Sequence, residues 1–444
     1  METRKKKTTK KGEVRERKAN WQEVYASVED IQRFLSERVF LRHNVVTGRV
    51  ECHRLTTGDS IGVGEDGKLC IVKGSPATTG PYWEVISDRL LNSLWAELSG
   101  VKLVRLEDMR RVIESDFVAD YHPFRYYLEQ LPRWHEEQGD FIMELSLTVN
   151  VRGGAEEQLR FYQYLKKWLV GMVAAWVDDA VVNNVILVLI GEQGSYKTTW
   201  FNYLLPPELK QYFYTKTNAQ RMSRDDLLTL AQYGLVCCEE LDTMRPSELN
   251  QLKAAVTMPS IDERAAYAHY HEHRKHIASF CGTGNNVQFL SDPTGNRRWL
   301  PFEVESIESP RSSPFNYVGI YAQAYALYRQ GFQFWFSQQE IVRLTEHNQH
   351  FETPRLEAEL VYLYFRVPQG AEPGEFMSVS LAIQIVGANL TQKLSPVYMG
   401  RAFSQLGFQQ VRTSTQRGYV VVRRSAEEMM SLRRSMACSI QSDG

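Results

Sequence analysis

The sequence lacks the features that would place it in a membrane or outside the cell. Its longest apolar stretches, residues 168–177 and 181–191, are shorter than the roughly 20 residues that a membrane-spanning helix needs. No apolar segment directly follows the basic N-terminus, so these residues do not form a secretory signal. The 6 cysteines among 444 residues have no paired metal-binding spacing, which indicates reduced, mostly buried thiols. We therefore expect a soluble, cytoplasmic protein without a membrane partner.

The chain also has almost no net charge, at −1, although its charges are unevenly distributed. The first 18 residues carry 9 Lys and Arg against 3 acidic residues. Such a tail either holds nucleic acid or is a solvated, disordered end. With 43% hydrophobic and 11% aromatic residues, most of the remaining chain is expected to fold into about two to four globular domains.

In the middle of the chain, apolar runs alternate with helical patterns. Residues 185–190 are a continuous run of leucine and β-branched residues, typical of a strand buried on both faces of a parallel sheet. Further apolar runs follow near residues 234–242, 276–285 and 297–304, with helical segments between them. Strands that alternate with helices predict an α/β fold with a doubly wound sheet.

The pattern divides the chain into segments of different character. After residue 351, three short helical patterns precede a basic strand pair at 408–424, which is typical of a winged helix. Winged helices bind DNA or dock to proteins, and both roles stay open. The expected segments are a basic disordered tail (1–20), a mixed α/β domain (21–114), a helical lead-in (115–180), the sheet core (181–310), a helical connector (311–350), a winged-helix-like domain (351–425) and a C-terminal tail (426–444).

The junction after the first central strand has the residues of a phosphate-binding loop. Residues 191–200 read GEQGSYKTTW and open a helix. A triphosphate needs converging backbone N–H groups, a cation near its outer phosphates and a hydroxyl on Mg²⁺, which Lys197 and Thr198 would supply. The residues expected to bind the cofactors ATP and Mg²⁺ are Gly191, Glu192, Gln193, Gly194, Ser195, Tyr196, Lys197, Thr198 and Thr199.

Tyr196 departs from this pattern, because it stands where such loops have glycine. One alternative is that the segment is only a tight strand-to-helix turn, and another is that Tyr196 has disabled a former nucleotide site. If the loop binds nucleotide, we expect Lys197→Ala to abolish ATP turnover. We also expect this change to leave the fold intact, with Lys197 as a solvent-side charge.

Two acids follow the apolar run at residues 234–238. A carboxylate at the end of such a strand can hold Mg²⁺ through water, and its neighbour can orient and deprotonate the attacking water. We assign Glu239 to the metal, with Thr198, and Glu240 to the water, and we expect them on a strand end adjacent to the loop. The alternative is an acidic helix start, in which Glu239, Glu240 and Asp242 favour the positive end of the next helix.

Two further polar groups belong to this candidate catalytic set. Asn285 follows the next apolar run and would help to aim the water, although Gly-Asn is also ordinary turn chemistry. Arg297 and Arg298 follow a Gly-Asn turn. A guanidinium from this subunit or a neighbour could stabilise charge at the terminal phosphate. The alternative is that the two arginines lie at the surface and donate hydrogen bonds to nearby backbone carbonyls.

A basic hairpin is expected before the strand that ends at residue 285. His269, His271 and His273 alternate and would share one strand face, so zinc is an alternative. No cysteine pair assists, and basic residues lie among them. A hairpin tip with these groups near Tyr267 and Tyr270 is better suited to phosphate backbones and base stacking, although an ordinary exposed hairpin has the same pattern. The expected nucleic-acid contacts are His271, His273, Arg274 and Lys275, with Arg401, Arg412, Arg417, Arg423 and Arg424 in the winged-helix-like region.

The ordered set GEQGSYKTT, LVCCEELD, ERAAY, GTGNN and DPTGNRRWLPFEV resembles the virulence-associated E family. These proteins are ATPases similar to superfamily 3 helicases and to primase-helicases of phages and mobile elements. The resemblance covers about residues 115–305. It implies an AAA+-type P-loop NTPase core, Mg-ATP hydrolysis, a homo-oligomeric ring such as a hexamer, and a hairpin that touches single-stranded DNA.

The same resemblance implies a role for each matching residue. No primase-like carboxylate cluster lies upstream, so a helicase without priming is implied. Lys197 and Thr198 would bind the nucleotide and the metal, and Glu239 with Glu240 would form the hydrolytic pair. Asn285 would be the sensor, one of Arg297 and Arg298 would be the arginine finger, and Arg264 would be an auxiliary basic residue.

The leading hypothesis is therefore a DNA-stimulated Mg-ATPase, a ring helicase or replication initiator of a mobile element that moves single-stranded DNA. The second hypothesis is an ATP-dependent DNA-binding switch or regulator that assembles on nucleotide without unwinding. The third is a DNA-binding scaffold whose loop no longer binds nucleotide.

Overall fold

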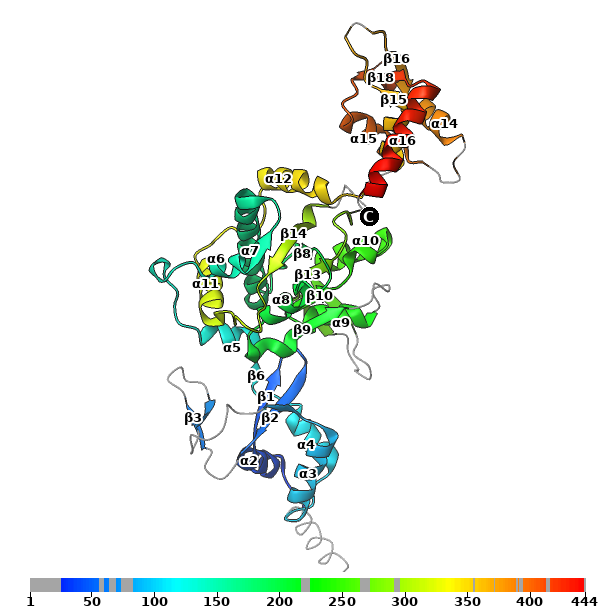
Figure 1. The fold of residues 1–444 in the computed structure, drawn as a ribbon. Helices are drawn as coiled ribbons and strands as arrows, with labels where there is room; N and C mark the ends of the chain where they lie inside the picture. Colours follow the sequence, from blue (N-terminus) through cyan, green and yellow to red (C-terminus); the bar gives the residue numbers. More distant parts are fainter. Residues whose placement is uncertain are drawn as a thin grey trace, which may run out of the picture. The chain divides into compact units, whose positions relative to one another are not determined.

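The computed structural model describes residues 25–55, 60–63, 69–72, 83–216, 224–263, 272–290, 296–353, 356–370, 372–388, 390, 394–412 and 416–442. The basic N-terminal tail lies outside these residues. The chain divides into two compact units, residues 1–285 with 297–344, and residues 286–296 with 345–444. In Figure 1 the first unit runs from blue to yellow, and the second is mainly orange and red.

The largest sheet among the described residues has six strands and lies in the first unit (Figure 1). Its lateral order is β7-β14-β8-β13-β10-β9, which are Val149–Val151, Trp299–Ile307, Ile186–Ile190, Ser279–Gly284, Leu235–Cys238 and Phe213–Lys216. β7 runs antiparallel to β14, and all other neighbours are parallel. The expected α/β architecture with a largely parallel sheet is confirmed.

Both faces of this sheet are buried, which explains the continuous apolar runs. Leu187 and Leu189 of β8 join Cys237 of β10 and Trp168 in one large apolar cluster. Successive strand residues point to opposite faces, and Val188 between them is also fully buried. A strand with a solvated face would instead show alternating polar residues.

Helices pack against the sheet and bury it. The long helix α7 (Gly154–Val177) is anchored by two indoles: Trp168 Nε1 donates to the Phe280 carbonyl at 3.0 Å and Trp176 Nε1 to the Gly234 carbonyl at 3.1 Å. The other helices around the sheet are α5 (Pro123–Glu129), α6 (Phe141–Leu147), α8 (Lys197–Leu204), α9 (Arg224–Gln232), α10 (Pro246–Val256), α11 (Tyr317–Arg329) and α12 (Gln338–Asn348). Short 3-10 turns are η1 (Glu136–Gln138), η2 (Pro207–Tyr212), η3 (Leu241–Thr243), η4 (Asn296–Arg298) and η5 (Gln349–Phe351).

The N-terminal part of the first unit is a mixed α/β region, as expected. Its sheet has the order β5-β2-β1-β6. Asn44 connects this sheet to the rest of the unit, because its Nδ2 donates to Glu51 Oε1 at 2.6 Å and to Tyr212 Oη at 2.7 Å. The elements are α2 (Val28–Arg38), β1 (Val39–Asn44), β2 (Arg49–Arg54), β3 (Ser60–Val63), β4 (Leu69–Val72), β5 (Glu84–Val85), α3 (Asp88–Ser99), α4 (Leu106–Ile113) and β6 (Asp120–Tyr121).

The second unit contains the three expected helices and the expected strand pair. They are α13 (Leu356–Tyr364), α14 (Val379–Gly387), α15 (Pro396–Gln405), β17 (Gln410–Arg412) and β18 (Arg417–Arg423). Three elements were not expected: β15 (Phe365–Arg366) and β16 (Glu375–Ser378), which both pair with β18, and α16 (Ala426–Ser442) in the expected tail. Most of the segment expected as the C-terminal tail is therefore the helix α16.

No helix within the described ranges combines the length and the apolar character needed to cross a bilayer.

Candidate functional site

The carboxyl ends of β8, β13 and β10 meet at one edge of the central sheet. In the strand register, Ile190 of β8 pairs with Gly284 of β13, and Cys238 of β10 pairs with Gly282. Because the three strands are parallel, the segments that follow them emerge together. We call this part of the sheet the loop edge, which comprises residues 191–199, 239–242 and 285.

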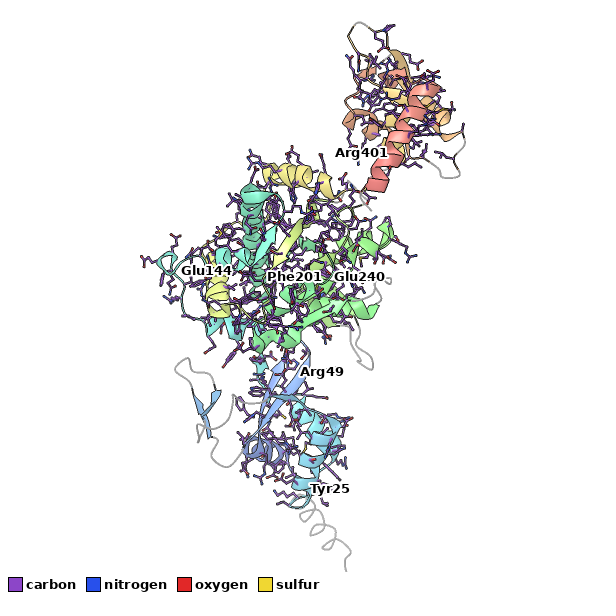
Figure 2. All side chains as sticks on the ribbon, in the orientation of Figure 1. Tyr25, Arg49, Glu144, Phe201, Glu240 and Arg401 are labelled. Atoms are coloured by element: carbon purple, nitrogen blue, oxygen red, sulfur yellow. The ribbon has the colours of Figure 1, made fainter. Side chains whose placement is uncertain are left out.

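The expected convergence of the loop, the acids and Asn285 on one edge is present, but the strand order differs from the expectation. β13 lies between the loop strand and the acid strand, so β8 and β10 are about 10 Å apart and not adjacent. Asn285 therefore lies between the loop and the acids. Glu239 is half-buried, while Glu240 and Asn285 are exposed; Figure 2 labels Glu240.

The loop after β8 has the backbone of a tight turn that opens a helix. Gly191 N–H donates to the Gly284 carbonyl at 3.2 Å, and a Cβ at Gly191 would lie 2.9 Å from the Val304 carbonyl oxygen. Gly194 has a φ of +88°. α8 begins directly after Tyr196, whose carbonyl accepts from Trp200 N–H at 2.7 Å. Both expected glycines are therefore required by the conformation.

Tyr196 adopts the conformation of the glycine that it replaces. Its φ is 61° and its ψ is 12°, which is left-handed, and its side chain is 45% exposed. Among the residues that the structure describes, the non-glycine residues with positive φ are Tyr196 and Glu240, and both lie at the loop edge. Each costs about 1–2 kcal/mol relative to an ordinary backbone conformation. Tyr196 thus keeps the loop shape at the expense of local strain.

Lys197 is the first residue of α8 and is 7% exposed. Its ammonium donates to the carbonyls of Gly191 and Glu192, both at 2.7 Å, and to Ser195 Oγ at 3.2 Å. Burial lowers the pKa of Lys197, and the charge of Asp242 opposes this shift. The expectation of a solvent-side charge was wrong, because the loop folds its own oxygens around the ammonium.

The acids after β10 do not lie at the start of the α-helix that follows, α10. α10 begins at Pro246, and the acid in its first turn is Glu248, which accepts from the backbone N–H of Arg245 at 2.8 Å. Glu240 precedes η3 with a φ of 53°, and its carbonyl accepts from Thr243 Oγ1 at 2.9 Å. The three acids therefore lie outside the first turn of α10, whereas Glu240 and Asp242 stand at the start of the short η3.

The oxygen donors at the loop edge fit a magnesium-bound nucleotide better than a resident metal. Thr198, in the first turn of α8, and Glu239 are both half-buried oxygen donors. Within the described ranges, no three His, Cys, Asp or Glu side chains are grouped so that they could hold a metal ion. Mg²⁺ usually keeps several waters and takes one or two carboxylates together with substrate phosphates.

Asp242 is a loop-edge residue that the sequence did not place at the candidate site. It was considered only as part of an acidic helix start, but its carboxylate lies over the end of β13, where a Cβ at Gly284 would be 2.9 Å from Oδ1. The signal was present in the spacing, since Asp242 follows the acid pair by two residues and both glycines of the GTG motif lie on one strand face.

Arg297 and Arg298 lie at the opposite edge of the sheet. The next residue, Trp299, pairs with Ile186 at the start of β8, whereas the loop follows the end of β8. The strand spans about 16 Å, so neither side chain reaches the loop of its own subunit. Arg297 is exposed; burial, followed by the charge of Arg297, lowers the pKa of the half-buried Arg298. A finger acting within one subunit is therefore excluded.

The expected hairpin is formed by β11 (Ser260–Glu263) and β12 (Glu272–Lys275). Lys275 pairs with Ser260 at the base of the hairpin, so the prediction that the basic residues sit at its tip is wrong for Arg274 and Lys275. The expected residues that lie outside the described part of the chain are Arg264, Tyr267, His269, Tyr270 and His271.

The two faces of β12 differ. His273 and Lys275 are exposed, whereas Arg274 is half-buried and pairs with the buried Ile261. The Arg274 guanidinium lies against Gly48, where an added Cβ would be 2.8 Å from Nη2. The exposed face of β12 therefore carries His273 and Lys275. The zinc alternative is not tested, because two of its three histidines are not described.

The basic residues of the second unit fall into two groups. Arg401 of α15, which Figure 2 labels, has its guanidinium carbon 5.9 Å from the ring centre of Tyr398. The exposed Arg412 and Arg417 pair across β17 and β18. Two others are engaged within the unit. Arg423 Nε binds Glu375, and Arg424 Nε donates to the Tyr362 carbonyl at 3.1 Å.

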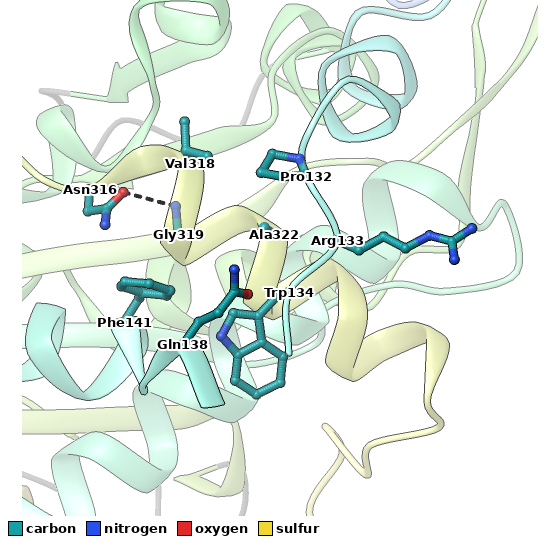
Figure 3. Close-up of a pocket in the computed structure, with 9 residues that line it drawn as sticks. All are labelled: Pro132, Arg133, Trp134, Gln138, Phe141, Asn316, Val318, Gly319 and Ala322. Carbon is teal, nitrogen blue, oxygen red and sulfur yellow. Dashed lines mark hydrogen bonds between the residues drawn. The ribbon is translucent and has the colours of Figure 1, made fainter. Parts of the chain in front are cut away.

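One pocket lies away from the loop edge, between the 132–141 segment and α11 (Figure 3). Its volume is about 140 Å³, smaller than the roughly 300 Å³ at which small-molecule sites begin. Its Asn316 side chain already accepts from Gly319 N–H at 3.0 Å, and its Trp134 Nε1 donates to the Gly139 carbonyl at 3.1 Å. These two polar groups are therefore already used for local structure.

Residues 138–353 match the family model of the virulence-associated protein E-like domain. The chain contains a virulence-associated protein E-like domain. This match confirms the resemblance drawn from the motifs, and the domain includes both the loop edge and the arginine pair. It extends beyond the expected region through α12.

Comparisons with individual proteins and solved structures give weaker similarities than the family model. No curated protein matches the sequence. The structure is similar to an apo structure of the NrS-1 C-terminal region, with 10% identity, a TM-score of 0.44, and coverage of 89% of this chain and 98% of that chain. An A form apo structure of the same region has 12% identity, a TM-score of 0.43 and the same coverage.

Replacing Tyr196 in the virulence-associated protein E-like domain by glycine is expected to stabilise the first unit by about 1 kcal/mol. Glycine removes the cost of the left-handed backbone, and this gain is partly offset by its greater freedom in the unfolded chain. Urea-induced unfolding would measure the change. Tyr196→Ala is the matched control, because it removes the ring but keeps the Cβ. An equal gain in both variants would mean that the ring, and not the backbone, is responsible.

Proposed function

We propose that the protein is a DNA-stimulated Mg-ATPase, a ring helicase or replication initiator that acts for a mobile element. The observation that carries this proposal is the loop edge. A glycine-bent loop with a buried lysine, a carboxylate pair and an amide emerge there from the carboxyl ends of three parallel strands. This is the place where open α/β sheets bind phosphate.

The fold supports a P-loop NTPase core of the AAA+ or superfamily 3 type. The loop strand β8 lies inside a sheet of five parallel strands, with β13 between it and the acid strand β10. A central loop strand lets groups from both flanking strands approach one phosphate site. In the second unit, α13, α14 and α15 with β16, β17 and β18 support a winged-helix-like domain.

At the loop edge, each residue has a task that its position supports. When a nucleotide binds, the Lys197 ammonium exchanges its hydrogen bonds to loop carbonyls for hydrogen bonds to phosphate oxygens. Backbone N–H groups at the start of α8 bind the other phosphate oxygens. Thr198 and Glu239 would hold Mg²⁺ when it is bound. Bound Mg²⁺ supplies charge neutralisation at the outer phosphates. Glu240, which is exposed, takes the proton of the attacking water, and Asn285 orients that water.

The arginine pair requires a second subunit. Arg297 and Arg298 lie at the opposite edge from the loop, so one of them can stabilise the phosphate charge only in a neighbouring copy. A contact between different edges of identical subunits is heterologous and closes into a ring when the rotation permits. This supports a homo-oligomeric ring, for which a hexamer is one possible size.

Single-stranded DNA is the proposed polymer partner. The exposed face of β12 with His273 and Lys275 offers donors to phosphates, and Arg401, Arg412 and Arg417 offer a second contact in the other unit. The virulence-associated protein E-like match supports a role in the replication of mobile elements.

ATP turnover by the full chain, with and without single-stranded DNA, tests the proposal. We expect turnover that DNA stimulates at least about threefold, because DNA would order the subunits into the ring that completes each site. Intact protein without turnover in either condition would defeat the enzyme proposal. Turnover and DNA binding without strand displacement on a forked duplex would favour the alternative, an ATP-dependent switch or regulator. Failure to bind labelled ATP would favour a scaffold.

A further inference from the structure

The four-stranded sheet of the N-terminal region has helices on one of its two sides. Successive residues of β1 point to opposite sides, so Val39 and Phe40 lie on different ones. Val39 packs in one apolar cluster with Cys52 of β2 and with buried residues of α2, α3 and α4, and we call this the helix side. The other side, which we call the ring face, is lined in the strand register by Phe40, Arg42, Asn44, Arg49, Glu51, His53, Val85 and Tyr121.

Aromatic rings and one guanidinium form a continuous row across the ring face. Arg42 Cζ lies 3.8 Å from the ring centre of Trp83 and 3.7 Å from that of Tyr121, so the guanidinium is held between two rings. The ring centres of Phe40 and His53 lie 5.6 and 6.1 Å from that of Trp83, and both rings are tilted against it. Phe40, His53 and Trp83 are all half-buried. The row is therefore fixed by packing and still has accessible ring surface.

The acidic groups of the four strands are not presented on the ring face. Glu51 is 4% exposed, and its carboxylate accepts from the Arg42 guanidinium at 2.7 Å from Nε and 2.6 Å from Nη2. Glu84 and Asp120 lie on the helix side in the strand register. Arg49, which Figure 2 labels, is exposed at the start of β2. The charge that the ring face offers to a ligand is therefore positive.

Accessible rings beside positive charge fit an unpaired nucleic-acid strand. Each base has a π-face that stacks on an aromatic ring whatever the sequence, and the phosphates attract cations. In a duplex these base faces are covered by neighbouring base pairs, so a surface ring favours a single strand. A protein helix would instead need an aliphatic surface, such as the one that Val39 and Leu41 form on the helix side.

We propose that the ring face binds single-stranded DNA, with bases stacked on Trp83 and Phe40 and a phosphate held by Arg49. The bound strand continues toward β12, because Arg274 at the base of the hairpin lies against Gly48 in the turn between β1 and β2. This inference rests on the DNA partner of the proposed function and not on ATP hydrolysis. It gives the N-terminal region a role in holding the strand.

Photo-crosslinking of the full chain to a single-stranded DNA that carries iodouracil tests the contact itself. Light couples this base to an aromatic side chain on which it is stacked, so we expect crosslinked peptides that contain Phe40 or Trp83, identified by mass spectrometry.

Fluorescence anisotropy with a labelled oligothymidylate tests the energetic part. Trp83→Leu is expected to weaken binding about tenfold, which is the contribution of one stacked base. Trp95→Leu is the matched control, because Trp95 of α3 is 37% exposed and belongs to a helix of the helix side. This control should bind as the wild type does.

The salt dependence of the same binding tests the phosphate contact. Arg49→Ala is expected to reduce the slope of log affinity against log salt concentration by about 0.7, the value of one phosphate on a single strand. Arg33→Ala, which removes an exposed arginine of α2, should leave the slope unchanged.

The outcomes separate this inference from the proposed function. Wild-type protein that turns over ATP and binds the strand, but crosslinks only outside the ring face and keeps its affinity in Trp83→Leu, would overturn the inference and assign the ring face to a protein contact. Crosslinks at Phe40 or Trp83 in a protein without ATP turnover would support the inference and defeat the proposed enzyme. An equal loss of affinity in Trp83→Leu and Trp95→Leu, without a crosslink on the ring face, would show a general folding defect and overturn the inference. Wild-type protein that binds no oligonucleotide would defeat both.

Discussion

Lys197→Met is expected to lower ATP turnover at least about a hundredfold. The ammonium is the charge that the loop holds ready for the outer phosphates, and charge stabilisation of a transition state is worth several kcal/mol. Because Lys197 is buried and bonded to three loop oxygens, the variant is also expected to lose about 1–3 kcal/mol of unfolding free energy. Turnover assays and urea denaturation measure the two effects separately.

A matched control distinguishes the chemical role of Lys197 from its structural role. Lys210 of η2 is also a lysine whose pKa is lowered by burial, and its ammonium donates to the Asn202 carbonyl. Lys210→Met should lose comparable stability and keep its turnover, because it lies outside the loop edge. Near wild-type turnover by Lys197→Met would show that the loop is only a turn.

Replacing Arg297 and Arg298 together by alanine is expected to lower turnover about a thousandfold while leaving ATP binding intact. An arginine finger acts on transition-state charge and contributes roughly 10³-fold or more. Because the pair lies at the edge opposite the loop, we expect the loss of turnover at the ATP site of the neighbouring subunit. Steady-state turnover and labelled-ATP binding of the double variant would measure both properties.

Mixing two inactive variants tests the shared site directly. In oligomers assembled from equal amounts of Lys197→Met and the double arginine variant, about a quarter of the interfaces combine an intact loop with an intact arginine pair. Recovery of about a quarter of the wild-type turnover is therefore expected. No recovery in oligomers shown to contain both variants would mean that the arginines do not act across the interface.

Local pattern was sufficient to find most of the elements. The apolar run before Gly191 predicted β8, and the helical connector expected at residues 311–350 contains α11 and α12. These predictions succeed because a strand buried on both faces and an amphipathic helix leave a direct record in the residue types. The GEQGSYKTTW loop was found in the same way, because glycine and lysine at fixed spacing have a local physical meaning.

The wrong or absent predictions have one cause: each depends on contacts between residues that are far apart in the sequence. β16 was not expected, since its four residues become a strand by pairing with β18, more than 30 residues later. Lys197 was expected to be solvent-exposed, because its residue type does not reveal that the loop closes around it. The basic residues of β12 were placed at a hairpin tip, whereas the register puts Lys275 at the base.

The sequence by itself determined the chain order of loop, acids, amide and arginines, and it determined that each follows or precedes a buried strand. Tertiary structure alone decided that β13 lies between β8 and β10, that Asp242 lies over Gly284 of β13, and that the arginine pair is at the opposite edge from the loop. The physical reason is that residue spacing along a chain fixes only local periodicity. Which strands become neighbours, and which strand ends share an edge, depends on the joint burial of faces that are far apart in the sequence.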